Sequence, residues 1–226
     1  MKTRNLSLTR SERAFTLIEL LVVMAIIATL AALLFPAFSG IKKGAAIKKA
    51  RAEMLKVVMA IDAYKAQFGH YPPDNPDNVA VNQLYYELVG TKLVNSNEYQ
   101  TESGQGAILT SGVPTFFGNK VSGFVNVTKG GGDDVQSAKN FVVGLRPNQY
   151  LDVVNNGVTG TVLGMLEKGP LMLNDSTGGK SINPWRYVST NPTNNPGHFD
   201  LWVDLIIGGK TNRISNWSQK PELVAN

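Results

Sequence analysis

A long uncharged stretch near the N-terminus constrains this chain more than any other feature. The 22 residues from Leu20 to Ile41 carry no formal charge and include the run LLVVMAIIATLAALLF. As an α-helix they would extend about 33 Å, against a hydrocarbon core of about 30 Å. A transmembrane segment is therefore predicted for residues 15–38. Two alternatives stay open: a buried helix of a soluble domain, and a cleaved secretory signal, whose apolar region is usually shorter.

Composition excludes several classes of function. The formal net charge is +5, but the first 14 residues hold four basic residues and one acidic residue, so the rest of the chain carries only +2. We therefore expect no nucleic-acid partner. The chain has no Cys and only two His, His70 and His198, which argues against disulfides, thiolate metal sites and a His-rich zinc site. No hydrolase elbow, zinc-protease motif or paired-carboxylate pattern is present, so we do not expect an enzyme.

Glu19 is the one acidic residue at the entrance of the apolar run. An ionised side chain at membrane depth is costly unless it is paired, which makes it a functional hypothesis. The alternative is that Glu19 lies among the lipid headgroups and only marks the boundary. Cleavage between Ala14 and Phe15 would create an ammonium group four residues before Glu19. That amine could pair with Glu19 of its own helix or of a neighbouring subunit, and the second pairing would fix the stagger between helices.

Residues 13–23, RAFTLIELLVV, resemble the class III leader of type IV pilins and type II secretion pseudopilins. The resemblance implies that a prepilin peptidase cuts between Ala14 and Phe15 and methylates the new amine of Phe15. It also implies that Glu19 is the acid used in assembly. The sequence departs from the family at Ala14, where Gly is usual. Because Ala is the next smallest side chain, we do not expect cleavage to be abolished.

The basic residues do not settle the orientation in the membrane. Six of them follow the apolar run and four precede it, so the positive-inside rule does not favour a cytoplasmic N-terminus. On composition alone the orientation is open. The resemblance implies a single-pass protein of the bacterial inner membrane with its C-terminal domain in the periplasm.

The helical pattern continues beyond the apolar run, so one helix is predicted for residues 15–68. Apolar residues recur at steps of three and four, which indicates a single buried stripe: Ile47, Ala50, Met54, Val57, Ile61, Tyr64 and Phe68. Packing of this stripe on the chain's own sheet is favoured over a coiled coil. A kink or local melting is predicted at Pro36, which lacks the N–H for an intrahelical bond.

Residues 69–226 are predicted to form a globular domain of short strands and turns. A short helix is expected around Val81–Leu88, closed by Gly90, and a third helix over Asp133–Val143. The predicted β-prone runs are residues 123–127, 150–154, 161–166, 185–189, 199–206 and 213–217. A helix followed by strands predicts an α+β fold, with a small antiparallel sheet packed on the helix. The three Trp residues, Trp185, Trp202 and Trp217, are expected in the sheet core rather than in a ligand platform.

Residues 183–217 resemble the closing strands of the major type II secretion pseudopilin, through NPWRY, PGHFDLW and ISNW. The resemblance implies a calcium-binding Gly-rich loop before the last strand, for which Asp200 and Asp204 are the candidate ligands. Lys210 and Arg213 stand in that loop and can supply positive charge in place of the ion, so the sequence favours a salt-bridged turn over a calcium site. No other cofactor is expected. Residues 69–182 are longer than the family pattern and resemble nothing we can name.

Together these features predict a pseudopilin subunit of a type II secretion system, with residues 1–14 as the cleaved leader. The expected partners are other copies of the chain, other pseudopilins, the prepilin peptidase, an inner-membrane assembly platform and secreted protein cargo. A type IV pilin or minor pilin is a close variant. An alternative of another class is a membrane-tethered binding module or enzyme that uses residues 1–38 only as an anchor.

Overall fold

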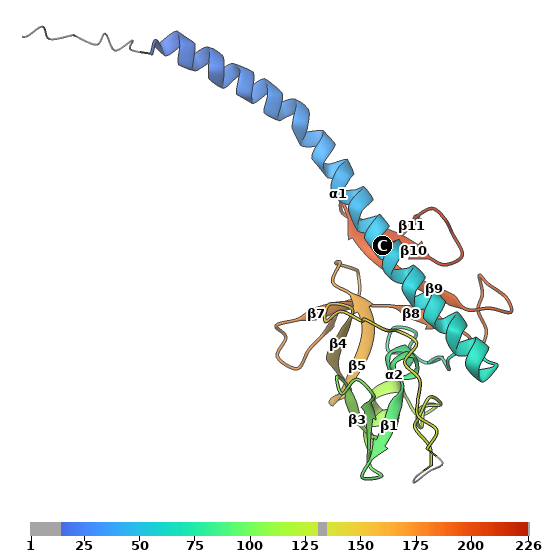
Figure 1. Ribbon diagram of the computed structural model, residues 1–226. Coiled ribbons are helices and arrows are strands. Elements are labelled where there is room, and N and C mark those ends of the chain that lie inside the picture. Colours follow the sequence, from blue (N-terminus) through green and yellow to red (C-terminus); the bar gives the residue numbers. More distant parts are fainter. Residues whose placement is uncertain (1–14, 131–134, 226) are drawn as a thin grey trace, which may run out of the picture. The chain divides into compact units, whose positions relative to one another are not determined.

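The computed structural model describes residues 15–130 and 135–225, with the side chains of residues 33–41 left out (Figure 1). The chain divides into two compact units at Lys42–Lys43. One continuous helix, α1 (Leu17–Phe68), contributes to both. The sheets that follow are antiparallel, which confirms the predicted α+β class with a long N-terminal helix.

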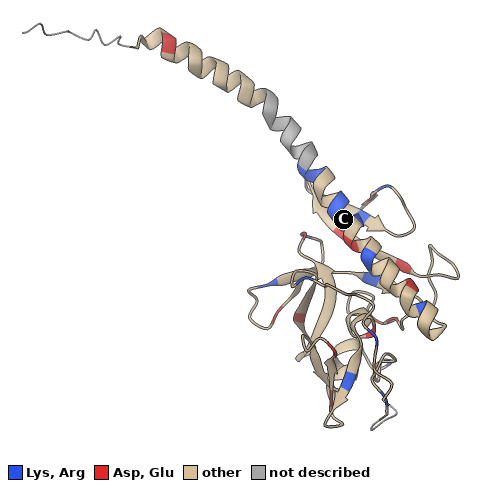
Figure 2. Cartoon of the chain, viewed as in Figure 1, with Lys and Arg blue, Asp and Glu red and all other residues tan. Residues whose placement is uncertain are grey.

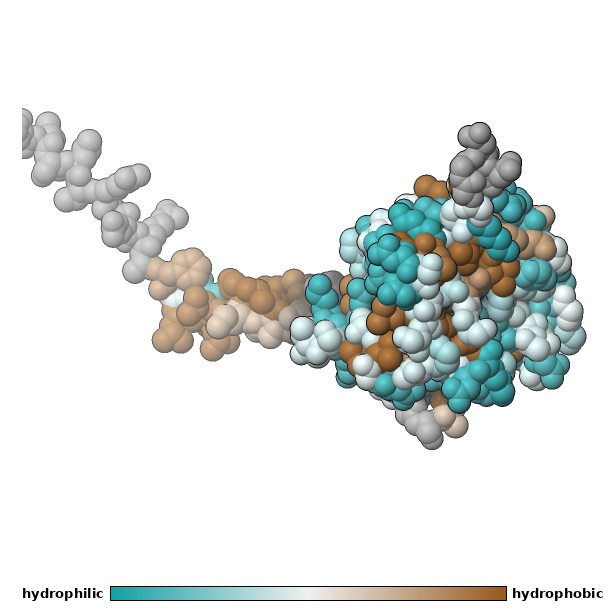
Figure 3. All heavy atoms as spheres, turned by 90° about the horizontal axis from the view of Figure 1, so that it is seen from below, coloured by the Kyte–Doolittle hydropathy of each residue, from teal (hydrophilic) through white to brown (hydrophobic). Residues whose placement is uncertain are grey.

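The first unit is the N-terminal part of α1. Its large apolar side chains are exposed in the single chain from Phe15 to Leu30, and they appear brown in Figure 3. Among the described residues, no helix is both long enough and apolar enough to cross a membrane. The helix runs without interruption through position 36. The Pro36 side chain lies outside those described, so the kink stays a prediction.

The amphipathic half of α1 belongs to the second unit and packs against its core, as the apolar stripe predicted. Five stripe residues are buried, and Ile47 and Phe68 pack against the same core as partly buried residues: the buried five are Ala50, Met54, Val57, Ile61 and Tyr64. The burial of side chains three and four positions apart stabilises both the helix and the core beneath it. The predicted stripe is confirmed.

The first sheet lies within residues 69–182, the segment for which the sequence suggested no family resemblance. It has the order β1-β2-β3, with β1 (Thr91–Val94), β2 (Glu98–Thr101) and β3 (Ala107–Leu109). Helix α2 (Leu84–Val89) precedes it and is entirely buried, and Gly90 ends that helix as predicted. A short 3₁₀ turn, η1 (Thr110–Gly112), and helix α3 (Val113–Phe117) follow.

Two four-stranded sheets complete the second unit. One has the order β4-β5-β7-β6, with β4 (Tyr150–Asn155), β5 (Val158–Met165), β6 (Leu173–Asn174) and β7 (Ser181–Pro184). The other has the order β11-β10-β9-β8, with β8 (Arg186–Val188), β9 (Asp200–Ile207), β10 (Lys210–Ser215) and β11 (Glu222–Val224). Five of the six predicted β-runs correspond to strands β4, β5, β8, β9 and β10.

Two sequence predictions in the insertion are wrong. Residues 135–143 contain no helix, and residues 131–134 lie outside those described. Residues 123–127 form no strand, apart from a single bridge between Val127 and Thr91. The reason is local: the backbone N–H groups of Val125 and Asn126 donate to the buried carboxylate of Glu87 instead of to a strand.

Candidate functional site at the start of the long helix

Glu19 and Thr16 bind each other at the first turn of α1. The Thr16 backbone N–H donates to Glu19 Oε2 at 2.9 Å, and the Glu19 backbone N–H donates to Thr16 Oγ1 at 3.3 Å. The Thr16 hydroxyl also donates to Glu19 Oε2, at 2.7 Å. Because α1 begins at Leu17, Thr16 is the N-cap and Glu19 the third helical residue. This reciprocal pattern is a capping box, which satisfies two backbone donors that the helix itself leaves unpaired.

Thr16 is the functional residue that the sequence analysis missed. Its signal was available, because a Ser or Thr followed three residues later by Glu is the sequence pattern of a capping box. From the sequence, Glu19 was interpreted as an acid that pairs with a cation or as a boundary residue among the lipid headgroups. The structure shows that the same acid also organises the start of its own helix.

The capping box leaves one oxygen of the Glu19 carboxylate available to a second partner. Both of its bonds to the carboxylate end on Oε2, and no hydrogen bond to Oε1 occurs among the described residues. Phe15, just before the box, is 73% exposed. Ala14 lies outside the described residues. Cleavage before Phe15 would not remove any of the groups that form the box, because these belong to Thr16 and Glu19.

The candidate calcium ligands do not form a joint site. Asp200 accepts the backbone N–H groups of Asn194 and Asn195 and the side-chain amide of Asn194. Asp204 accepts two bonds from the Arg213 guanidinium, at 2.8 and 3.1 Å, and Arg186 lies 3.9 Å away. Within the described part of the chain, no group of three or more His, Asp or Glu residues is placed to hold a metal.

The turn before the last predicted strand explains this arrangement. Gly208 and Gly209 alone connect β9 to β10, both with positive φ (59° and 74°), as a tight hairpin turn requires. The hairpin register places Asp204 directly opposite Arg213. The expected ion-binding loop is therefore a two-residue turn, and the geometry favours the salt-bridged alternative.

The Trp residues divide between core and partly buried positions. Trp185 is buried in the core, as predicted. Trp202 and Trp217 are partly buried and contact each other edge to face, with ring centroids 5.7 Å apart.

A second acid, Glu87, lies in the core of the globular unit. Its carboxylate accepts the Tyr64 hydroxyl at 2.9 Å and the backbone N–H groups of Val125 and Asn126 at 2.8 and 3.0 Å. Burial raises the pKa of Glu87, while the three donors oppose that shift. This cluster ties α1 to α2 and to the following loop. The Glu87 residue is fully buried, and its role is structural.

Comparisons with known proteins agree with the N-terminal geometry. Residues 9–35 match the prokaryotic N-terminal methylation motif, a span that contains Phe15, Thr16 and Glu19. The chain is 40% identical over 67 residues to the type II secretion system core protein G of Escherichia coli (strain K12). That match covers 30% of this chain and 46% of the relative, so the chain spans less than half of the relative's length. No solved structure matches. The matches confirm the resemblance to pilins and pseudopilins.

Proposed function

We propose that this chain is a pseudopilin-type subunit of a type II secretion system. It is held in the bacterial inner membrane by residues 15–38, with residues 69–226 in the periplasm, and is then polymerised into a periplasmic filament. The observation that carries the proposal is a methylation motif that ends in an exposed apolar helix, with the carboxylate of Glu19 at its first turn. The protein works as a structural subunit rather than as an enzyme.

The maturation step follows from the same residues. A prepilin peptidase cuts between Ala14 and Phe15, removes residues 1–14 and methylates the Phe15 amine. The new cation then pairs with Glu19 Oε1 of an adjoining subunit, while Oε2 stays in the capping box. In low dielectric this pairing both neutralises the acid and sets the register between helices. The partners are further copies of the chain, other pseudopilins, an inner-membrane assembly platform and secreted cargo.

The substitution Glu19→Gln separates pairing from capping. Gln at this position supports a capping box as Glu does, but it carries no charge. Glu19→Ala removes both functions, and Glu98→Gln on β2 serves as the control for a charge lost elsewhere. We expect both Glu19 variants to insert into the membrane and to be absent from sheared filaments, with the control incorporated normally. Normal incorporation of Glu19→Gln would reduce Glu19 to a capping residue and contradict the pairing.

A type IV pilin or minor pilin is the second candidate. It stays open because the methylation motif alone does not distinguish the two assemblies. Deletion of the chain's gene from its host distinguishes them. Loss of an exported protein with surface fibres intact supports the secretion role, and loss of the fibres supports the pilin role.

A further inference from the structure

The outer face of α1 in the globular unit is apolar although it faces away from the core. Leu55 is 58% exposed and Met59 is 64% exposed, and three exposed small apolar residues continue their spacing along the helix: Ala52, Ala63 and Ala66. These five positions recur at steps of three and four, so they form one stripe, which we call the outer stripe. An exposed apolar stripe on a helix marks a surface that another element covers.

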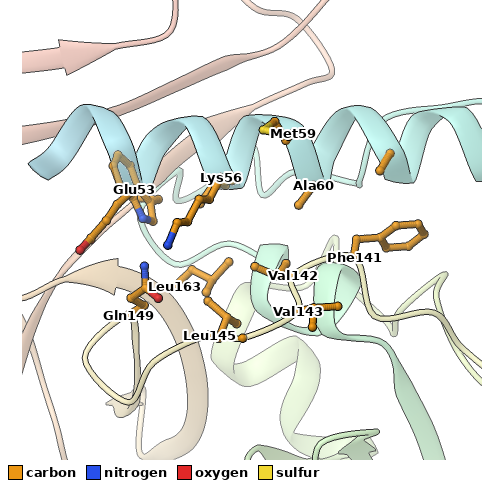
Figure 4. Close-up of a pocket in the computed structure, with 14 residues that line it drawn as sticks. Glu53, Lys56, Met59, Ala60, Phe141, Val142, Val143, Leu145, Gln149 and Leu163 are labelled. Atoms are coloured by element: carbon orange, nitrogen blue, oxygen red, sulfur yellow. The ribbon is translucent and has the colours of Figure 1, made fainter. Parts of the chain in front are cut away.

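A groove runs along one side of the outer stripe (Figure 4). Met59 and Ala60 of α1 face Val142, Val143 and Leu145 across a cavity of about 450 Å³. Its lining includes Glu53, which is only 5% exposed and whose Oε2 has no hydrogen-bond partner among the described residues. Lys56 lines the same groove and is exposed.

A second groove runs along the other side of the stripe. Arg51, Leu55 and Val58 of α1 face the segment from Ser215 to Gln219 across about 460 Å³. Arg51 Nη2 and Ser215 Oγ are buried there without a hydrogen-bond partner in the described part of the chain. The outer stripe thus lies between two grooves, each lined by residues of α1 and of the rest of the globular unit.

The exposed charges beside the stripe have opposite signs on its two sides. At ~100° per residue, Lys56 lies on the Glu53 side and Asp62 on the Arg51 side, about 120° apart around the helix. Neither belongs to an ion pair among the described residues, and they are too far apart around and along α1 to pair with each other. Each side of the stripe is thus suited to the opposite side of another copy (Figure 2 shows the charges along the helix).

We propose that the outer stripe is the contact between successive copies of this chain, with Lys56 of one copy paired to Asp62 of the next. The inference rests on the proposed function, and it adds the surface through which the globular units meet. Because different sides of the helix meet, the contact is heterologous and generates an open polymer rather than a closed dimer. For parallel helices, a stagger of six residues, or about 9 Å, brings Asp62 level with Lys56.

A charge exchange tests the pairing in the full-length chain assembled by its own secretion machinery. Lys56→Asp and Asp62→Lys should each reduce the filament yield several-fold, because each places like charges at the contact. The double variant Lys56→Asp with Asp62→Lys should restore most of the yield. Both side chains are exposed, so these variants are expected to fold, and circular dichroism of the purified chains checks this.

Cysteine cross-linking tests the contact directly, since the chain has no native Cys. The double variant Lys56→Cys with Asp62→Cys should give a ladder of disulfide-linked multimers on oxidation of filaments, and each single variant should remain monomeric. A dimer from either single variant, or filaments that form normally and yield no ladder, would overturn the proposal. Absence of filaments from the unmodified chain would instead reject the proposed function on which it rests.

Discussion

Glutamates of this chain take different roles according to the donors around them. Glu19 accepts bonds at the first turn of an exposed helix, whereas Glu87 is enclosed by three donors in the core. Glu53 is buried with one oxygen unsatisfied. The sequence singled out Glu19 because it adjoins an apolar run. It gave no comparable signal for Glu87, whose donors come from residues 23 to 39 positions away.

The hydroxyl of Tyr64 is expected to stabilise the folded chain through Glu87. Tyr64→Phe keeps the packed ring and removes one hydrogen bond to a buried carboxyl, so the free energy of unfolding should fall by about 1–3 kcal/mol. Tyr150→Phe is the matched control, because its bond to Gln105 is exposed, and it should change stability by less than about 0.5 kcal/mol. Denaturant unfolding measures both. Equal effects of the two substitutions would contradict the assigned role of Tyr64.

The buried carboxyl of Glu53 is expected to make stability depend on pH. Burial raises the pKa of Glu53 above its ordinary value of 4.5, although Lys49, Arg146 and Lys56 oppose the shift. A group whose pKa is raised on folding contributes stability that is present below the ordinary value and is lost as pH rises through the raised value. Glu53→Gln removes this loss, so the variant should become more stable than the natural chain as pH rises toward neutral.

Thermal unfolding of Glu53→Gln between pH 4 and pH 8 measures that difference. The gain over the natural chain should grow with pH and then level off. A constant difference across the range would show that Glu53 does not titrate on folding.

At the scale of elements, α1 carries two apolar stripes with different functions. The first stripe, from Ile47 to Phe68, was predicted from its spacing and packs in the core. The outer stripe escaped prediction because Lys48, Lys56 and Asp62 are interspersed with it, and those charges indicate a solvated face. Only the structure shows that Leu55 and Met59 form a connected surface beside two grooves.

Two Met residues on α1 distinguish the stripes. Met54 is 4% exposed in the core, so Met54→Ala should lower the free energy of unfolding by about 2–5 kcal/mol through the cavity it leaves. Met59→Ala, on the outer stripe, should change stability by less than about 0.5 kcal/mol and yet reduce filament formation. Denaturant unfolding and filament yield are measured on the same preparations. Loss of stability in Met59→Ala would place that residue in the core and remove it from the interface.

The strands were predictable where alternation and turn residues agree. Asn156-Gly157 and Gly208-Gly209 occupy two-residue turns with positive φ, and the hairpins β4–β5 and β9–β10 around them were recognised from their β-prone runs. Strands β1–β3, β6, β7 and β11 have two to four residues each, so an alternation of apolar and polar residues could not be recognised there in the sequence. The sequence left the loop before β10 open between a calcium site and a salt-bridged turn, because it could not show that Asp204 and Arg213 face each other across the hairpin.

Across the whole chain, the first turn of α1 links the methylation motif of residues 9–35 to the proposed polymer. The methylation motif matches residues 9–35, and under the proposed cut before Phe15 the capping box would keep all its groups, with no described hydrogen bond on Glu19 Oε1. The apolar side chains of residues 15–30 are exposed in the single chain, and they require either lipid or neighbouring helices around them. In the proposed function, the membrane surrounds these side chains first and neighbouring helices of the polymer surround them later.

The mass of the mature N-terminus tests whether cleavage before Phe15 supplies the cation that Glu19 is proposed to bind. Filaments sheared from producing cells would be digested, and the N-terminal peptide identified by mass spectrometry. We predict a chain that begins at Phe15 and carries one methyl group on its amine. A polymer whose chains begin at Met1, or beyond Leu34, would contradict the account, because Glu19 would then have no cationic chain end to bind.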